Sequence, residues 1–209
     1  MHAHHEAVAA DRRTRAQAAA DVDRLIATRN GRDLTIRPIQ IADVDRLDRM
    51  FGRLSPASVR FRFFSPLRVV PRSALLRLAL VDHCRDEAFV ALDGDDIVGV
   101  AGYNGLPGPD HAGPREAELA VAVEDAWQRN GLGRALTRRL TRTAREHGCE
   151  AFLVRILPDN RAALALLRRL APDAVVQFAG GEYAARLALV RAEPVRDFLR
   201  THADPVSTR

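Results

Sequence analysis

The chain has 209 residues, 47% of them hydrophobic, so one ordinary domain with a full core fits its length, and global disorder is not expected. Its formal net charge is +5, and all 32 basic residues are arginine, because the sequence contains no lysine. These arginines are scattered among acidic residues, and only 5% of the residues are aromatic. Both features argue against a nucleic-acid interface, which needs clustered cations and rings for base stacking.

The cysteine and histidine patterns point away from disulfides and metals. Cys84 and Cys149 are far apart and lie in neither CxxC nor Cys/His ligand spacing, which indicates a reduced, cytoplasmic protein. His2, His4 and His5 cluster at a chain end, where a specific metal site is rare, so no metal is expected. No apolar run reaches membrane-spanning length, and the N-terminus lacks the apolar core of a signal peptide. We therefore expect a cytoplasmic protein without membrane contact.

In chain order, residues 1–30 form an Ala/Arg-rich extension, expected to be partly helical (16–28) or flexible. Residues 31–192 are the predicted domain, and 193–209 are a polar tail interrupted by proline. The alternation in 34–38 ends at a proline, which predicts a first strand at a sheet edge.

The next segments predict short helices and a hairpin. Ser55 and Pro56 provide the N-cap and the first position of one helix. The expected elements are helices over 43–51, 56–64 and 72–81 and a hairpin of strands 88–92 and 97–103.

The second half of the domain contains one parallel crossover. An apolar strand over 116–123 leads through a glycine turn into an amphipathic helix over 132–147, and the next strand covers 151–157. A helix from Asn160 to Leu170 and two strands near Val175 and Leu187 follow. This order predicts an α/β (α+β) fold, with a mixed sheet and helices on both faces.

The glycine turn is the most informative feature of the sequence. The first amides of a helix have no partner within the helix, and the positive end of the helix dipole lies behind them, so they bind anions. Gly131 and Gly133 allow close approach of an anion, and Arg129 and Arg134 lie beside the turn. The anionic partner that we expect is a phosphorylated cofactor. The turn lacks the Lys-Ser/Thr of a P-loop and the third glycine of a Rossmann fingerprint.

The segment Gln128-Arg129-Asn130-Gly131-Leu132-Gly133 resembles the Arg/Gln-x-x-Gly-x-Gly/Ala motif of the GCN5-related N-acetyltransferases. The resemblance spans about residues 33–190, and Asn160 also matches, because the superfamily places an Asn near the cofactor there. Further segments resemble the catalytic domain of bacterial protein lysine acetyltransferases: Leu54-Ser55-Pro56-Ala57-Ser58, Arg62-Phe63-Phe64-Ser65 and Ala117-Glu118-Leu119-Ala120.

The resemblance implies a mostly antiparallel central sheet of about six to seven strands, with acetyl-CoA held between splayed strands 116–123 and 151–157. It also implies direct acetyl transfer to an amine, without a covalent enzyme intermediate and without a metal. The acceptor is a protein lysine or a small molecule such as a polyamine, amino acid or antibiotic. The cofactor-binding residues that it implies are Val121, Ala122, Val123, Gln128, Arg129, Asn130, Gly131, Leu132, Gly133, Arg134 and Asn160.

Glu118 is the candidate catalytic base. Alternation places it on one strand face with two alanines, which leaves room for a ligand, and an attacking amine must lose a proton. The alternative is a surface glutamate paired with one of the many arginines. Glu116 and Glu124 are weaker candidates for the base.

The sequence departs from the family at the expected general acid. Many members carry a tyrosine where this chain has Leu167, and Tyr103 or Tyr183 are the available substitutes. A thiolate is a good leaving group, so solvent protonation is the other route. A rival hypothesis follows from this departure, namely a non-catalytic acyl-CoA-binding regulatory module.

The sequence leaves two points open, the place of three phenylalanines and the oligomeric state. Phe61, Phe63 and Phe64 line an acceptor pocket or belong to the core. The N-terminal extension and the C-terminal strands are candidate surfaces for a homodimer. Because the chain has no lysine, it cannot acetylate itself on a lysine side chain.

Overall fold

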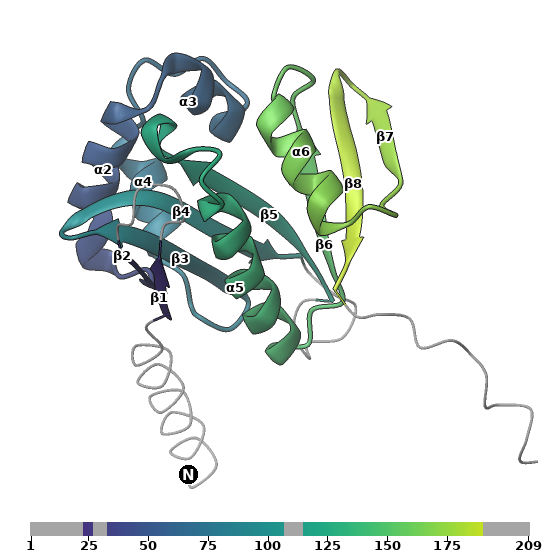
Figure 1. Ribbon diagram of the computed structural model, residues 1–209, viewed down its shortest axis with the longest axis horizontal. Helices are drawn as coiled ribbons and strands as arrows, with labels where there is room; N and C mark the ends of the chain where they lie inside the picture. The colour runs from purple at the N-terminus through teal and green to yellow at the C-terminus, as the bar shows by residue number, and fades with distance from the viewer. Residues whose placement is uncertain (1–22, 27–32, 107–114, 190–209) are drawn as a thin grey trace, which may run out of the picture.

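The computed structural model describes residues 23–26, 33–106 and 115–189 (Figure 1). The predicted domain boundaries near residues 30 and 192 fall outside these ranges, so they stay predictions. One expectation is wrong: residues 23–26, which were expected to lie within a helix, form strand β1 (Asp23–Ile26), paired antiparallel with the next strand. The rest of the expected helix lies outside the described residues. Strand pairing at the sheet edge overrides the local helical preference here.

Within the described residues, the central sheet has eight strands, in the order β1-β2-β3-β4-β5-β6-β8-β7. This is more than the six to seven that the resemblance implies, because β1 adds a strand at the edge. Strands β5 and β6 are its one parallel pair, and every other neighbouring pair is antiparallel. The mixed, mostly antiparallel sheet with a central crossover is therefore confirmed, and β1 places β2 one position inside the edge. The other strands are β2 (Asp33–Pro38), β3 (Asp86–Asp93), β4 (Asp96–Gly105), β5 (Glu116–Val123), β6 (Ala151–Ile156), β7 (Val176–Ala179) and β8 (Glu182–Ala188).

Helices cover both faces of the sheet, as predicted. Helices α2 and α4 pack on one face, and α5 and α6 pack on the other (Figure 1). Within the described residues, no helix has the length and apolar character needed to cross a bilayer. The helices are η1 (Ile41–Asp43), α2 (Val44–Arg53), α3 (Pro56–Phe63), α4 (Arg72–Ala79), η2 (Asp125–Trp127), α5 (Leu132–Glu146) and α6 (Arg161–Leu170).

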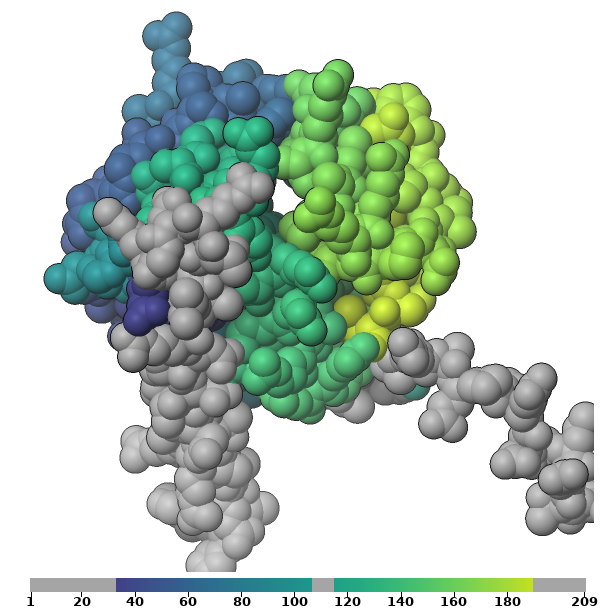
Figure 2. Space-filling model, viewed as in Figure 1, coloured from purple at the N-terminus to yellow at the C-terminus, as the bar shows by residue number. Residues whose placement is uncertain are grey.

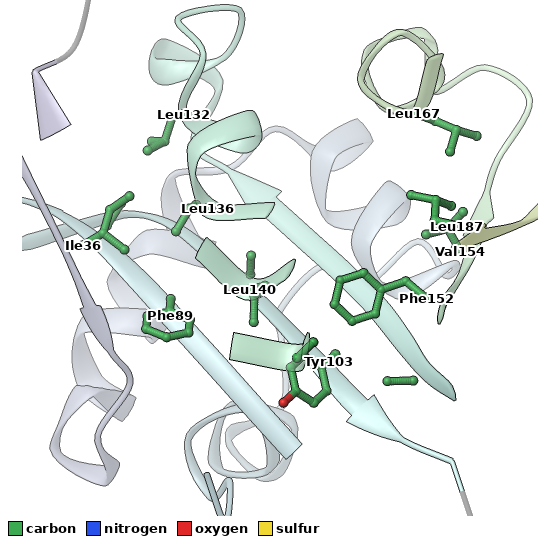
Figure 3. Close-up of a cluster of buried hydrophobic side chains, with 14 of the residues drawn as sticks. Ile36, Phe89, Tyr103, Leu132, Leu136, Leu140, Phe152, Val154, Leu167 and Leu187 are labelled. Atoms are coloured by element: carbon green, nitrogen blue, oxygen red, sulfur yellow. The ribbon is translucent and has the colours of Figure 1, made fainter. Parts of the chain in front are cut away.

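The core on the α5 side forms because leucines recur every fourth residue along that helix. Leu132, Leu136 and Leu140 share one helix face and pack against Phe89 and Tyr103 of the sheet (Figure 3). Each is at most 2% exposed, and burial of one such side chain stabilises the fold by about 2 kcal/mol. This packing fixes the N-terminal end of α5 relative to the sheet.

Strands β5 and β6 separate after a short paired stretch. Their register covers only Glu116↔Ala151, Ala117↔Phe152 and Glu118↔Leu153, although β5 continues to Val123 and β6 to Ile156. The two strands diverge toward α3 and α6 (Figure 1). The main-chain groups along the β6-facing edge of residues 119–123 therefore have no partner from β6.

Candidate active site

The glycine turn lies directly before α5 and has an unusual backbone. Gly131 is the N-cap of α5, with φ +91°, and Arg129 adopts φ +60°. The first turn of α5 contains no acidic residue, so no side chain there competes with a bound anion. Trp127 is buried in the core before the turn. The first amides of α5 lack partners within the helix, which is the geometry that suits an anion.

The two glycines of the turn are under different structural constraints. Gly131 needs its left-handed conformation, although a Cβ there would meet no atom within 4 Å. Gly133 has no such backbone requirement, and a Cβ there would lie 3.6 Å from Leu166 Cδ2 and 3.8 Å from Val123 Cγ2, which is ordinary contact. The protein itself therefore has room for a Cβ at position 133.

The turn is anchored to α3 by polar contacts. The side-chain amide of Gln128 donates to Val123 O (3.1 Å) and Ser58 Oγ (3.2 Å). Asp125 accepts from the amide and hydroxyl of Ser55 and from the hydroxyl of Ser58, at 2.8–2.9 Å. Burial raises the pKa of Asp125, but these hydrogen bonds outweigh it and hold that pKa below its usual value. The serine-rich segment seen in the sequence therefore fixes α3 beside the turn.

The middle of α3 contacts the other arm of the molecule, which consists of β6, α6, β7 and β8, whereas the arm with β5 and α5 carries the glycine turn. Arg60 forms an ion pair with Asp159, which precedes α6, so α3 bridges the divergence between β5 and β6. Phe61 and Phe64 face a cavity in that divergence, whereas Phe63 packs on Phe51 with ring centroids 5.4 Å apart. The phenylalanines are thus divided between the pocket and the core.

A cavity of about 100 Å³ occupies the divergence between the strands. Its apolar walls are formed by Val121 of β5, Val154 of β6 and Leu167 of α6. Two charged residues also line it, Arg62 of α3 and Arg155 of β6. Figure 2 shows an opening between the α5 and α6 sides of the molecule. The cavity adjoins a larger groove of about 1220 Å³ along β6 and β8, which shares Val154 and Arg155 with it.

The structure brings most of the predicted cofactor-binding residues to one side of this divergence. Val121 lines the cavity, whereas Ala122 is buried in the core on the other face. Asn160 lines the cavity and caps α6, because its Oδ1 accepts from the Ala163 amide at 3.0 Å. The residues of the glycine turn lie at the start of α5. Leu132 is buried there, and Asn130 and Gly133 are partly buried. The exposed residues of the turn are Arg129, Gly131 and Arg134.

Glu118 lies at the last paired position before the strands separate. Its Oε1 accepts hydrogen bonds from Arg155 Nε and Nη2 at 3.1 and 2.9 Å, and its side chain is 46% exposed. The two weaker candidates also pair with arginines: Glu116 with Arg186, and Glu124 with Arg53. Glu118 differs from them in reaching the groove and standing next to the cavity. Its role as a base stays a prediction.

The tyrosines lie elsewhere. Tyr103 is 1% exposed, and its hydroxyl pairs with His147 Nδ1 at 2.9 Å. Burial, followed by the negative charge of Glu87, raises the pKa of Tyr103. Tyr183 packs on Phe178, with ring centroids 5.2 Å apart. Neither side chain lines the cavity or the groove, and Leu167 stands at the cavity wall in place of the expected tyrosine.

Sequence reasoning missed two arginines beside the cavity. Arg155 was not considered, although a charged residue within the apolar strand Ala151–Ile156 was a visible signal. Arg62 was noted only as part of a resembling segment. The polar contacts of these two arginines cannot be read from the pattern of hydrophobic residues.

Comparisons with known proteins agree with this geometry. The chain matches the acetyltransferase (GNAT) family over residues 59–171, which run from within α3 through the glycine turn to the end of α6. An acetyltransferase of Pseudomonas aeruginosa is 30% identical over 154 residues, covering 69% of this chain and 80% of that protein.

Two solved structures are similar in fold. The GNAT domain of PAT from S. lividans has a TM-score of 0.73 at 24% identity and covers 80% of this chain and 96% of its own. The second, yncA from Salmonella typhimurium, was determined with its cofactor acetyl-CoA, and has a TM-score of 0.60 at 22% identity, covering 77% of this chain and 97% of its own. With the family match over residues 59–171, these findings show that the chain belongs to the GNAT family of acetyltransferases.

Proposed function

We propose that this acetyltransferase moves an acetyl group from acetyl-CoA directly to the nitrogen of an amine. The observation that carries the proposal is the divergence of β5 and β6 beside the glycine turn. The amides at the start of α5 would hold the pyrophosphate, and the unpaired edge of β5 would bind the pantetheine arm through main-chain hydrogen bonds. The small apolar cavity then receives the thioester end.

The chemistry requires a neutral amine at the thioester carbonyl. The amine nitrogen attacks the carbonyl carbon, the C–N bond forms as the C–S bond breaks, and CoA leaves as a thiolate. The amine proton passes to Glu118, directly or through water, and solvent protonates the thiolate. Glu118 and Arg155 border the groove, so the acceptor is expected to approach from the groove.

The acceptor class is open within this proposal. A protein lysine is supported by the resemblance of three segments, including Leu54-Ser55-Pro56-Ala57-Ser58, to bacterial protein lysine acetyltransferases. A small amine is supported by the size of the cavity, about 100 Å³. The test is release of free CoA thiol from acetyl-CoA with polyamines, amino acids and a lysine-containing peptide, each with mass-spectrometric detection of the acetylated product.

A second candidate is a non-catalytic acyl-CoA-binding module. Leu167 at the tyrosine position and the ion pair between Glu118 and Arg155 favour it. It predicts acetyl-CoA binding with no acetylated product from any acceptor. Product from any amine, above the rate without protein, rejects this second candidate.

A further inference from the structure

Arg62 lies in the wall of the cavity and is held there from both sides. Helix α3 is fixed at its start by the contacts of Ser55 and Ser58 with Asp125, and near its middle by the ion pair of Arg60 with Asp159. Arg62 follows on the same helix and is partly buried. Its position across the divergence is therefore set by both arms of the molecule.

The charge of Arg62 is not matched by a carboxylate of its own. Within the described parts of the chain, no carboxylate lies within ion-pair distance of it. The carboxylate whose charge acts on it is that of Glu118, which already accepts two hydrogen bonds from Arg155. Burial lowers the pKa of Arg62, and Glu118 only partly opposes this effect. Arg155 has a second carboxylate partner, because its Nη1 lies 3.8 Å from Glu182 Oε2, whereas the printed contact of the Arg62 guanidinium is with the Phe63 ring, 5.2 Å from its centroid. Arg62 is therefore the guanidinium at the cavity edge without an ion pair among the described residues.

The unpaired positive charge of Arg62 disfavours binding in the cavity of a cationic acceptor that has no negative group. Each further positive charge raises the energy of a partly buried arginine, whereas an anion lowers it. A guanidinium also binds a carboxylate in a planar fork with two parallel hydrogen bonds. The anion is not expected to be the cofactor's pyrophosphate, because the amides at the start of α5 already provide that site.

We propose that Arg62 binds a carboxylate of the acceptor, so that the enzyme acetylates small amines of the amino-acid type. This inference rests on the proposed amine acetylation. The carboxylate would lie against Arg62, while the amine would point to the thioester near Glu118. Its nitrogen forms the new bond as described above, and the carboxylate takes no part in the bond changes. Arg62 is then an acceptor-binding residue that determines specificity.

The test compares matched acceptors. Wild type, Arg62→Gln and Arg62→Lys are assayed with acetyl-CoA on L-leucine and 3-methylbutylamine, and on L-phenylalanine and 2-phenylethylamine. The two acceptors of each pair differ by one carboxylate. The ratio of their kcat/KM values is compared between wild type and variant, so that the different basicities of the two amines cancel. Arg77→Gln, which removes an exposed arginine of α4, is the matched control. A terminally blocked lysine peptide forms a third class of acceptor, and acetyl-CoA affinity is measured for every variant.

We expect Arg62→Gln to lower kcat/KM for the amino acids about 10- to 100-fold, the cost of losing a hydrogen-bonded charge partner. The kcat/KM for the simple amines should not fall, because they have no carboxylate to lose and the charge that opposes a cationic amine is removed. The Kd for acetyl-CoA should be unchanged, and Arg62→Lys should retain part of the preference for the amino acids. Arg77→Gln should behave as wild type.

Several results would overturn the inference. One is an equal loss on both members of each pair, and another is a loss of acetyl-CoA affinity, which would assign Arg62 to the cofactor. A wild type that acetylates the blocked lysine peptide better than any amino acid would also reject it, as would an Arg62-dependent preference for succinyl-CoA as donor. In these cases amine acetylation itself stands. Acetyl-CoA binding with no product from any amine would reject both the inference and the proposed function.

Discussion

Arg155 Nε and Nη2 both donate to Oε1 of Glu118, at 3.1 and 2.9 Å, across the point where β5 and β6 separate. Both side chains are about half exposed, at 55% and 46%, so the pair contributes little to stability, about 0–1 kcal/mol. Its effect is positional, because it fixes the carboxylate at the edge of the cavity. It also means that Glu118 can act as a base only if it accepts a proton while in contact with a cation.

Glu118→Gln tests this role. We expect kcat to fall about 100-fold or more, the usual contribution of a general base, with the acetyl-CoA affinity unchanged. The matched control is Glu116→Gln, which removes another arginine-paired glutamate from the same face of β5, at its paired end. Steady-state kinetics on the best acceptor decide the point. If both variants keep the wild-type kcat, Glu118 is only a surface ion-pair residue.

The two glycines of the turn should differ in their effect on stability. Gly131→Ala places a Cβ on a backbone with φ +91° and should lower the free energy of unfolding by about 1–2 kcal/mol. Gly133→Ala meets only ordinary contacts in the first turn of a helix, so it should be neutral or stabilising by up to about 1 kcal/mol. Urea denaturation of the two variants measures this difference. Equal destabilisation would contradict the described turn.

Asp43 should contribute to acid sensitivity. It is fully buried, and Arg37 donates to both of its oxygens at 2.6 and 2.7 Å. Burial raises the pKa of Asp43, but the hydrogen bonds from Arg37 and the Gln40 amide outweigh it, so that pKa lies below its usual value. Because the folded-state pKa is the lower one, the stabilisation is present above about pH 4 and is lost as the pH falls through the folded-state pKa.

The corresponding variant is Asp43→Asn. It should cost about 3 kcal/mol at pH 7, because it leaves Arg37 without its partner, and should flatten the loss of stability below about pH 4. Asp48→Asn, at an exposed position of α2, is the control. Urea unfolding at pH 7 and pH 3 measures both effects. An unchanged acid dependence in Asp43→Asn would show that other carboxylates govern it.

Tyr103→Phe should separate stability from catalysis. The variant removes the hydroxyl that pairs with His147 and should lower the free energy of unfolding by about 1 kcal/mol. The kcat for acetyl transfer should stay within about twofold of wild type, because Tyr103 lies in the core and away from the cavity. A large fall in kcat with an intact fold would show that Tyr103 does act as the general acid.

The features that could be predicted from the sequence are local ones. The glycine turn, α5 and the strands β3 to β6 follow from periodicity and from residues that punctuate the chain. The segment at residues 23–26 was expected to be helical, and it forms a strand because β2 offers it an edge, which no local pattern records. The same limit applies at the site. The contact of Glu118 with Arg155 depends on the register of two strands that α5 separates in sequence.

Arg62 shows why a residue's role can be hidden in an apolar run. Its neighbours in the sequence are three phenylalanines, a pattern typical of a helix packed on the core whose charged side chain points to solvent. The structure instead places it at the cavity, because α3 is tied to Asp125 on one arm and to Asp159 on the other. These two contacts join segments far apart in the chain, so the place of Arg62 at the cavity depends on tertiary contacts that the local sequence does not show.

The central claim is tested most directly by calorimetric titration of the purified chain with acetyl-CoA, beside the variant Gly133→Asp. An aspartate in the first helical turn suits the helix dipole, so the fold is expected to persist, while its carboxylate repels a pyrophosphate at the same amides. We expect micromolar binding by wild type and no detectable binding by Gly133→Asp, with an unchanged circular dichroism spectrum. If wild type binds neither acetyl-CoA nor CoA, or if Gly133→Asp binds as tightly as wild type, the start of α5 is not the pyrophosphate site and the account is contradicted.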